Sequence, residues 1–267
     1  MSTYVFSDVH GHRATLDRAL ERVSPGAGDA VFCLGDMIDR GPDPVGVMRL
    51  TRSLPNVCVL KGNHEDLMLD ALDHRDDVVA QANWAINGGM ATLSGLREAP
   101  EDEASELVGW VRGLPLSAHV EVAGRHYVMA HAGIRPGGSP PADGAWSAAA
   151  LDALLSAQTP DDLLWIRDEF WSVPTGLLDE RGEGPIVVAG HTPTPYLASM
   201  TDEFDRPVRN ESGIAQMVRV GARDATGGVA DRWDIDSGAA GGAGFGQVTI
   251  VRLDDGEEFA EPVRDGE

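Results

Sequence analysis

The chain has 267 residues, of which 42% are hydrophobic, and a formal net charge of −22 at pH 7. This length suits one large α/β domain, and this hydrophobic content can bury a sizeable core, which excludes an intrinsically disordered chain. The negative charge argues against non-specific binding to nucleic acid or to anionic membranes, so we expect neither as a partner.

The N-terminus and the cysteines point to a cytoplasmic protein. The first residues lack the basic and apolar regions of a signal peptide, and no apolar stretch approaches the roughly 20 residues that span a bilayer. Cys33 and Cys58 lie in apolar stretches and fit neither a disulfide framework nor a thiolate metal site. A reducing cytoplasm is therefore the expected compartment.

Short apolar runs of strand length recur along the chain, and several stretches between them have helical spacing. Strands followed by helices predict an α/β fold, and later segments without an intervening helix predict a mixed sheet. Expected helices cover about 16–23, 67–72 and 107–111. The expected strands are 4–6, 30–34, 57–60, 127–130, 186–189, 233–236 and 247–251.

We expect a single domain over 1–267. Two segments read as long loops, 133–144 and 192–232, and the second is an extended insertion. The acidic residues from about 254 to 267 read as a loose tail.

Each of five predicted strands ends at a short polar motif. Ligands collect beyond the carboxyl ends of strands in such sheets, so the fold would bring these motifs together. The motifs are Asp8-Val9-His10-Gly11, Gly35-Asp36-Met37-Ile38-Asp39-Arg40-Gly41, Gly62-Asn63-His64-Glu65, His131-Ala132-Gly133 and Gly190-His191-Thr192.

The motifs supply enough nitrogen and oxygen ligands for two divalent metal ions. Without a thiolate, this set favours Mn²⁺, Fe or Zn²⁺. Two such ions would hold a bridging hydroxide that attacks phosphorus in line with the ester oxygen. The candidate ligands are Asp8, His10, Asp36, Asn63, His131 and His191.

The remaining motif residues suit proton and phosphate chemistry. His64 follows Asn63 directly and is a candidate proton donor to the leaving oxygen, with Asp39 holding its imidazole in the charged form. Arg40 has the planar fork that grips phosphate oxygens. Glu65 is expected to orient a ligand or the turn.

The ordered motifs resemble the PPP-type metallophosphatases, in particular the bacterial serine/threonine phosphatases related to the lambda-phage enzyme. Asn87-Gly88-Gly89, Leu164-Trp165-Ile166-Arg167 and Asp236-Ser237-Gly238-Ala239 look like further landmarks of this family. The resemblance implies an αββα sandwich of the calcineurin-like metallophosphoesterases, often with Mn²⁺.

The resemblance also implies individual roles. The first metal would be held by Asp8, His10 and Asp36. The second would be held by Asp36, Asn63, His131 and His191. His64 with Asp39 matches the general-acid pair, and Arg40 with Arg167 matches the phosphate-binding arginines. The role of Arg167 comes from the resemblance alone.

Two departures from the family pattern stand out. Ser7-Asp8 replaces the usual Gly-Asp, which removes little chemistry, and the stretch from Met200 to Arg232 looks longer than the family needs. This longer stretch would narrow the cleft or bind a partner, so it bears on the choice of substrate.

Three functions remain open at this point. The first hypothesis is a protein Ser/Thr phosphatase with a phosphoprotein or small phosphoester substrate. The alternative is a dinucleoside tetraphosphate (diadenosine tetraphosphate) hydrolase, because related bacterial proteins share these motifs. The third is a non-catalytic phospho-binding protein, against which the complete ligand set counts. The sequence leaves the oligomeric state open.

Overall fold

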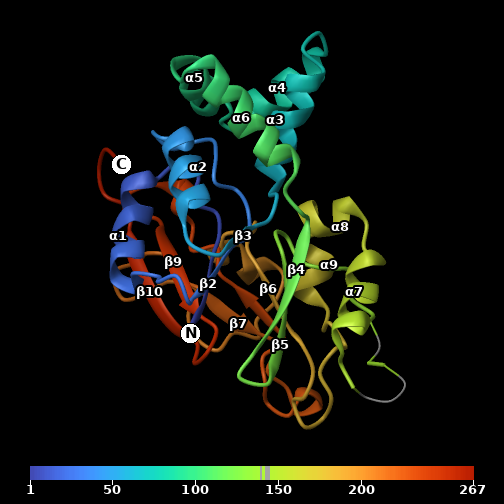
Figure 1. The fold of residues 1–267 in the computed structure, drawn as a ribbon. Coiled ribbons are helices and arrows are strands. Elements are labelled where there is room, and N and C mark those ends of the chain that lie inside the picture. The colour runs from blue at the N-terminus through green and yellow to red at the C-terminus, as the bar shows by residue number, and fades with distance from the viewer. Residues whose placement is uncertain (139, 142–144) are drawn as a thin grey trace.

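Two five-stranded mixed sheets form the centre of the protein in the computed structural model, which describes residues 1–138, 140–141 and 145–267 (Figure 1). The first sheet has the order β10-β9-β1-β2-β3, with β1, β2 and β3 parallel to one another. Its strands are β1 (Thr3–Phe6), β2 (Ala30–Cys33), β3 (Val57–Val59), β9 (Gln247–Arg252) and β10 (Glu257–Pro262).

The second sheet has the order β4-β5-β6-β8-β7, in which β5, β6 and β8 are parallel and the two edge strands are antiparallel to their neighbours. Its strands are β4 (Ser117–Val122), β5 (Arg125–Ala130), β6 (Ile186–Ala189), β7 (Val218–Val220) and β8 (Arg232–Asp234).

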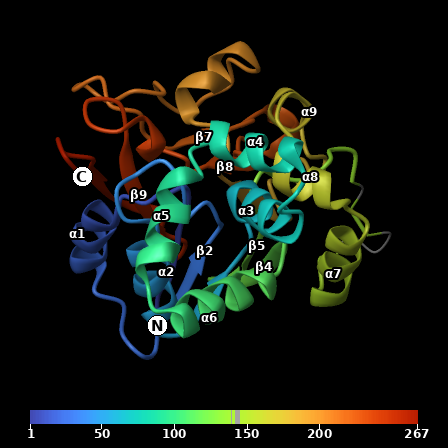
Figure 2. The same cartoon turned by 90° about the horizontal axis from the view of Figure 1, so that it is seen from above.

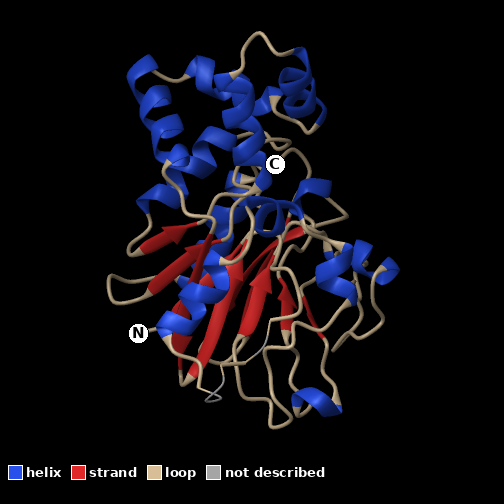
Figure 3. Cartoon of the chain, turned by 90° about the vertical axis from the view of Figure 1, so that its right-hand side faces the viewer, coloured by secondary structure: helices blue, strands red, loops and turns tan. Residues whose placement is uncertain are grey.

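Buried side chains from both sheets form one core between them. Val5 and Phe32 of the first sheet belong to the same cluster as Met129 and Val188 of the second. Helices cover the two outer faces, which confirms the expected αββα sandwich (Figure 3). The covering helices are α1 (Arg13–Val23) and α2 (Pro44–Ser53) on the first sheet and α7 (Ala148–Ser156), α8 (Pro160–Trp165) and α9 (Asp168–Ser172) on the second.

Four further helices form a lobe at one end of the sandwich, at the top of Figure 1 and facing the viewer in Figure 2. The lobe begins where β3 leads into α3, so it lies beside the motif at Asn63. Its helices are α3 (Asn63–Asp73), α4 (Val78–Ile86), α5 (Met90–Glu98) and α6 (Glu101–Arg112). None of the helices in the described ranges is long and apolar enough to cross a bilayer.

The seven expected strands are present with small shifts of their ends, and the expected helices correspond to α1, α3 and α6. The expected loop 133–144 lies partly outside the described residues, which exclude 139 and 142–144. Segment 192–232 is not only a loop. It contains the 3-10 helices η1 (Thr194–Ser199) and η2 (Asp224–Thr226) and the edge strand β7, whose residues Val218 and Val220 are fully buried.

The prediction of a loose C-terminal tail is wrong. Residues 257–262 form β10, which pairs with β9 over its whole length. Phe259 packs on Tyr4, with ring centroids 6.4 Å apart, and this contact anchors the strand. The acidic side chains of the segment are neutralised in part by arginines, because Arg18 forms an ion pair of 2.6 Å with Glu267.

A buried arginine holds α9 against the second sheet. The guanidinium of Arg232 is fully buried and pairs with Asp231, with 2.8 Å between Nε and Oδ1. Its Nη1 donates to the carbonyl oxygens of Phe170, Trp171 and Val173 at 2.8 to 2.9 Å. These carbonyls belong to the end of α9 and the residue after it, where helix carbonyls lack partners of their own.

Replacing this arginine should strongly destabilise the fold. Breaking a buried ion pair by removing one partner costs about 3–5 kcal/mol, because the other charge stays buried. We expect Arg232→Leu to lower the free energy of unfolding by this amount in urea titrations. Arg181→Leu is the matched control, since Arg181 is 74% exposed and a surface change of this kind stays within about 0.5 kcal/mol. Equal losses of unfolding free energy in both variants would contradict the role of Arg232 in holding α9 against the sheet.

Candidate metal centre

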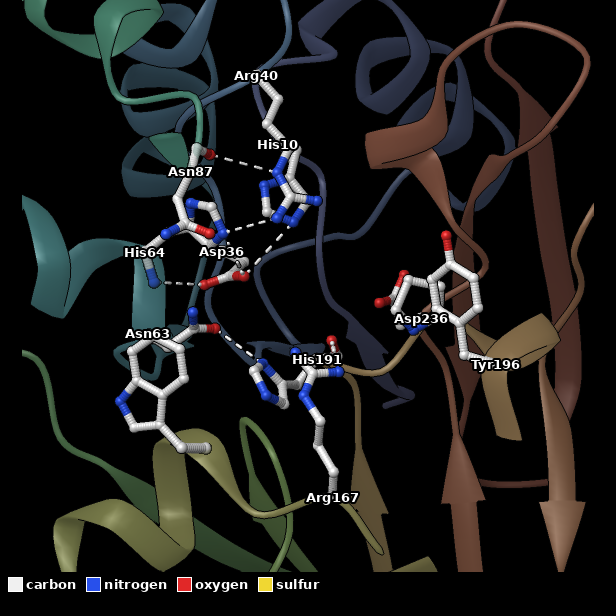
Figure 4. Close-up of a pocket in the computed structure, with 12 residues that line it drawn as sticks. His10, Asp36, Arg40, Asn63, His64, Asn87, Arg167, His191, Tyr196 and Asp236 are labelled. Carbon is white, nitrogen blue, oxygen red and sulfur yellow. Dashed lines mark hydrogen bonds and ion pairs between the residues drawn. The ribbon is translucent and has the colours of Figure 1, made fainter. Parts of the chain in front are cut away.

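The five motifs meet where the strands end, although they span residues 8 to 191. Each predicted ligand follows a strand: Asp8 and His10 come after β1, Asp36 after β2, and Asn63 begins α3 after β3. The second sheet contributes two histidines, after β5 and β6. Figure 4 shows four of the six predicted ligands, His10, Asp36, Asn63 and His191, around one region. All six are buried, and they are Asp8, His10, Asp36, Asn63, His131 and His191.

Backbone hydrogen bonds connect the loops that carry these residues. The backbone N–H of His10 donates to the carbonyl of Asp36 at 2.9 Å, and that of Gly190 donates to the carbonyl of His131 at 2.8 Å. A third contact crosses between the sheets, because the backbone N–H of His191 donates to the Asp8 carboxylate at 3.0 Å. These hydrogen bonds hold the loops in fixed positions relative to one another.

The site is built on strained backbone. Six of the predicted site residues have a positive backbone φ angle, between 46° and 69°. Residues other than glycine rarely adopt this region. Such strain costs of order 1–3 kcal/mol each and clusters at functional sites. The six are Asp8, His10, Asp36, Asp39, Arg40 and His191.

Two glycines allow backbone and carboxylates to approach closely. A Cβ on Gly62 would lie 2.2 Å from Oδ1 of Asp36, and a Cβ on Gly190 would lie 2.0 Å from Oδ2 of Asp8. Any side chain at these positions would displace a predicted ligand. The glycines of these motifs are therefore required by packing around the carboxylates.

The fully buried carboxylate of Glu65 holds the turn that presents Asp36. It accepts from the backbone N–H groups of Asp36 and Met37, each at 2.9 Å, and from that of Gly62 at 2.8 Å. Two ligand-bearing loops are thus joined through one side chain, which is the orienting role expected for Glu65.

Hydrogen bonds to backbone carbonyls fix the tautomers of His131 and His10. The carbonyl of Leu34 lies 3.0 Å from Nδ1 of His131, and that of Ile38 lies 3.0 Å from Nδ1 of His10. Because a carbonyl only accepts, each Nδ1 is assigned the hydrogen. Burial lowers the pKa of both histidines, so the neutral form prevails and each Nε2 is an unprotonated acceptor.

The acceptor nitrogens of His131 and His10 face oxygen atoms at short range. Nε2 of His131 and Nδ1 of His191 each lie 2.8 Å from the amide oxygen of Asn63. Asp36 directs one carboxylate oxygen to each side: Oδ1 is 3.5 Å from Nε2 of His131, and Oδ2 is 3.4 Å from Nε2 of His10. Facing lone pairs repel unless a positive charge lies between them, as a bound cation would.

The local charge balance also favours cations. Burial, together with the carboxylates of Asp8 and Glu65, raises the pKa of Asp36 well above its usual range. Burial and Asp8 likewise raise the pKa of Asp236, and burial and Asp236 raise that of Asp234. Buried carboxylates that destabilise one another in this way are stabilised by divalent ions.

The donor set therefore fits two divalent metal ions, with Asp36 between them. Its ligand atoms are carboxylate, amide and imidazole groups, which suit Mn²⁺, Fe or Zn²⁺. Among the described residues, Asp36 belongs to two groups of candidate ligands, one with His10 and His64 and one with His131 and His191. The assignment of individual ligands stays a prediction.

His64 is better placed as a proton donor than as a ligand. Its Nδ1 lies 2.7 Å from Oδ2 of Asp39, and its Nε2 lies 3.1 Å from Nη2 of Arg40. A guanidinium in contact with Nε2 is a poor neighbour for a metal ion, whereas the carboxylate at Nδ1 orients the ring as in an acid–base pair.

The helical lobe supports this pair through residues that the sequence did not identify. Asp39 is fully buried and also accepts from the indole Nε1 of Trp84 at 3.1 Å. Its backbone N–H donates to the hydroxyl of Thr92 at 2.9 Å, and this hydroxyl donates back to the Asp39 carboxylate. Both residues flank Asn87-Gly88-Gly89, and this proximity to a family landmark was the one signal for them.

A cavity of about 150 Å³ is lined by four of the predicted ligands, His10, Asp36, Asn63 and His191 (Figure 4). Arg167 lines it, with Nη1 donating to the carbonyl of His191 at 3.3 Å and to the hydroxyl of Thr192 at 3.0 Å. The cavity lining includes five residues for which the motifs gave no role: Asn87, Trp165, Pro193, Tyr196 and Asp236. His12, the nearest other histidine in sequence, does not line it, and its Nδ1 contacts the carbonyl of Glu267.

Known proteins match this chain in sequence and in fold. The family model described as calcineurin-like phosphoesterase matches residues 1–218. A protein of Dechloromonas aromatica named bis(5'-nucleosyl)-tetraphosphatase, symmetrical, is 30% identical over 186 residues, which are 67% of this chain and 59% of that protein. A protein of the same name from Erwinia tasmaniensis is 39% identical over 139 residues, 51% of this chain and 46% of that protein.

The chain thus spans about half the length of the curated relatives that it matches. Among solved structures, a metallophosphoesterase from Sphaerobacter thermophilus superimposes with a TM-score of 0.52 at 17% identity, covering 99% of this chain and 88% of that chain. A likeness at this identity concerns the fold alone.

Divalent ions should stabilise the folded protein through Asp36. A ligand that binds the native state alone adds about 2.7 kcal/mol at a concentration 100 times its Kd. We expect Mn²⁺ to raise the melting temperature, EDTA to reverse the rise, and Asp36→Asn to remove most of it, as measured by calorimetry. Asp70→Asn, an exposed carboxylate on α3, is the matched control and should keep the full shift. Equal shifts in both variants would refute the role of Asp36.

Proposed function

The chain belongs to the calcineurin-like phosphoesterase family, and we propose that it uses two divalent metal ions to hydrolyse dinucleoside tetraphosphates. The convergence of acceptor atoms around Asp36 carries the proposal for a metal-dependent phosphoesterase. The choice of substrate rests on the curated relatives, whose printed names describe symmetrical bis(5'-nucleosyl)-tetraphosphatases. These names favour the dinucleotide hydrolase over the protein Ser/Thr phosphatase that the motifs first suggested.

The proposed ligands divide into two groups that share Asp36. Asp8, His10 and Asp36 would hold one ion, and Asp36, Asn63, His131 and His191 would hold the other. When bound, such a pair of ions supplies an activated water and neutralises charge on the phosphate. The carbonyls of Ile38 and Leu34 would keep His10 and His131 in the tautomer that binds a cation.

His64 would give a proton to the leaving oxygen. Burial alone would lower the pKa of His64, but the carboxylates of Asp36 and Asp39 outweigh this effect and raise the pKa. The raised pKa favours an imidazolium that can act as general acid near neutral pH. The buried contacts of Asp39 to Trp84 and Thr92 would keep the imidazole aimed at the cavity.

Arg40 and Arg167 would bind the phosphate oxygens that do not react. Arg40 here donates to Nε2 of His64, so a bound phosphate would compete for its guanidinium and leave Nε2 free to carry the proton. Burial lowers the pKa of Arg167, although a guanidinium stays protonated in proteins. Two arginines and two metal ions suit a substrate with several negative charges, as a tetraphosphate has.

A substrate panel at fixed Mn²⁺ concentration tests the proposed substrate. We expect diadenosine tetraphosphate to be cleaved into two molecules of ADP, with a kcat/KM at least about tenfold above that for a Ser/Thr phosphopeptide. Chromatography of the products distinguishes symmetrical cleavage from release of AMP or inorganic phosphate. A higher kcat/KM for the phosphopeptide would instead support the protein phosphatase.

Replacing His64 should separate turnover from metal binding. Loss of a general acid slows a reaction by about 10²–10⁴-fold, so His64→Asn should lower kcat by this factor while the protein still takes up metal. His74→Asn is the matched control, because His74 directly follows the last residue of α3, the helix that carries His64, but its side chain is 62% exposed. Unchanged kcat in the His64 variant, or loss of its metal, would contradict the acid role.

A further inference from the structure

Two aromatic side chains are exposed to solvent, unlike the other aromatic residues of the protein. The chain has six Trp, three Tyr and six Phe, and most of these rings are buried or half-buried. Within the described ranges, Trp165 and Tyr196 are the two exposed aromatic residues, at 38% and 57% of their surface. Both line the cavity that His10, Asp36, Asn63 and His191 also line. Exposed aromatic rings at the rim of a polar cavity are typical of ligand binding.

Each ring is attached to a segment that also carries a predicted site residue. Trp165 ends α8 two residues before Arg167, and its ring meets the edge of His191, with centroids 5.9 Å apart. Tyr196 lies in η1, five residues after His191. Each aromatic residue therefore lies within a few residues of a predicted site residue, Arg167 or His191.

The Tyr196 ring lies on the far side of the site from His64. In Figure 4 it is drawn across the view from His64 and Asn63. Phe245 lies behind it with ring centroids 6.5 Å apart, and the guanidinium of Arg209 sits 4.8 Å from the Phe245 centroid. With these contacts on one side, the tyrosine remains more than half exposed.

The cavity is too small to enclose a whole dinucleoside tetraphosphate. Pockets that enclose drug-sized ligands measure about 300–1,000 Å³. At about 150 Å³, this cavity takes the reacting phosphates but not two nucleosides. The nucleosides of a dinucleoside tetraphosphate must therefore lie outside it, at the rim where the two rings are exposed.

We propose that Trp165 and Tyr196 are two nucleobase platforms, one for each half of the substrate. The inference rests on the proposed function, because a symmetrically cleaved substrate has one base on each side of the scissile bond. An aromatic ring stacks on the π-face that all bases share, so the platforms recognise nucleotides without selecting the base. The same site would therefore hydrolyse diadenosine and diguanosine tetraphosphates at similar rates.

Calorimetric binding of ADP and of inorganic pyrophosphate tests the platforms directly. The measurements use a His64→Asn background with Mn²⁺, so that ADP is not turned over. We expect Tyr196→Ala and Trp165→Ala each to weaken ADP binding about tenfold while pyrophosphate binding is unchanged. Tyr196→Phe and Trp165→Phe should restore ADP binding, and Val79→Ala, an exposed apolar residue on α4, should leave both ligands unaffected. Equal effects on ADP and pyrophosphate would overturn the proposal.

Steady-state kinetics in the wild-type background separates this inference from the proposed function. Each alanine variant should raise the KM for diadenosine tetraphosphate about tenfold, whereas the inhibition constant of inorganic pyrophosphate should stay within about twofold of wild type. If the wild-type protein does not cleave diadenosine tetraphosphate but ADP binding still depends on the rings, the proposed function fails and the platforms stand. If it cleaves the dinucleotide and both alanine variants match wild type, the platforms are overturned and the function stands. Alanine variants that lose phosphopeptide binding but keep ADP binding would also overturn the platforms.

Discussion

The chemistry of the site depends on lone pairs that face one another in a buried space. The carbonyls of Leu34 and Ile38 fix the tautomers of His131 and His10, so two unprotonated nitrogens point at oxygens of Asn63 and Asp36. Burial keeps water away and makes the repulsion costly. Such an arrangement is stable when cations fill the space between the acceptors, and the donor chemistry fits two of them.

The fold holds these groups together in spite of the repulsion. Strained turns at the strand ends present the side chains, and Glu65 and Asp8 join the loops through backbone N–H groups. The core between the two sheets and the buried Arg232 fix the framework beneath the turns. A rigid framework that stores strain at one point is typical of a site organised before its ligand arrives.

Much of this arrangement could be predicted from the sequence. The strands could be predicted because most are contiguous runs of apolar residues. The motifs could be recognised because each directly follows such a run. Trp84, Thr92 and Tyr196 were not, since their roles come from tertiary contacts and exposure that no local pattern encodes. β10 was missed because half of its residues are glutamates and it ends in a proline, whereas Phe259, whose contact with Tyr4 anchors it, is its one large apolar residue. The choice of substrate could not be predicted for a related reason. The metal ligands determine the reaction, whereas the residues at the rim of the cavity determine which substrates bind.

Anomalous diffraction from crystals grown with Mn²⁺ tests the central claim most directly. The account predicts two peaks on either side of the Asp36 carboxylate, one beside His10 and Asp8 and the other among Asn63, His131 and His191. A single peak, or density for water alone between these acceptors, would contradict it.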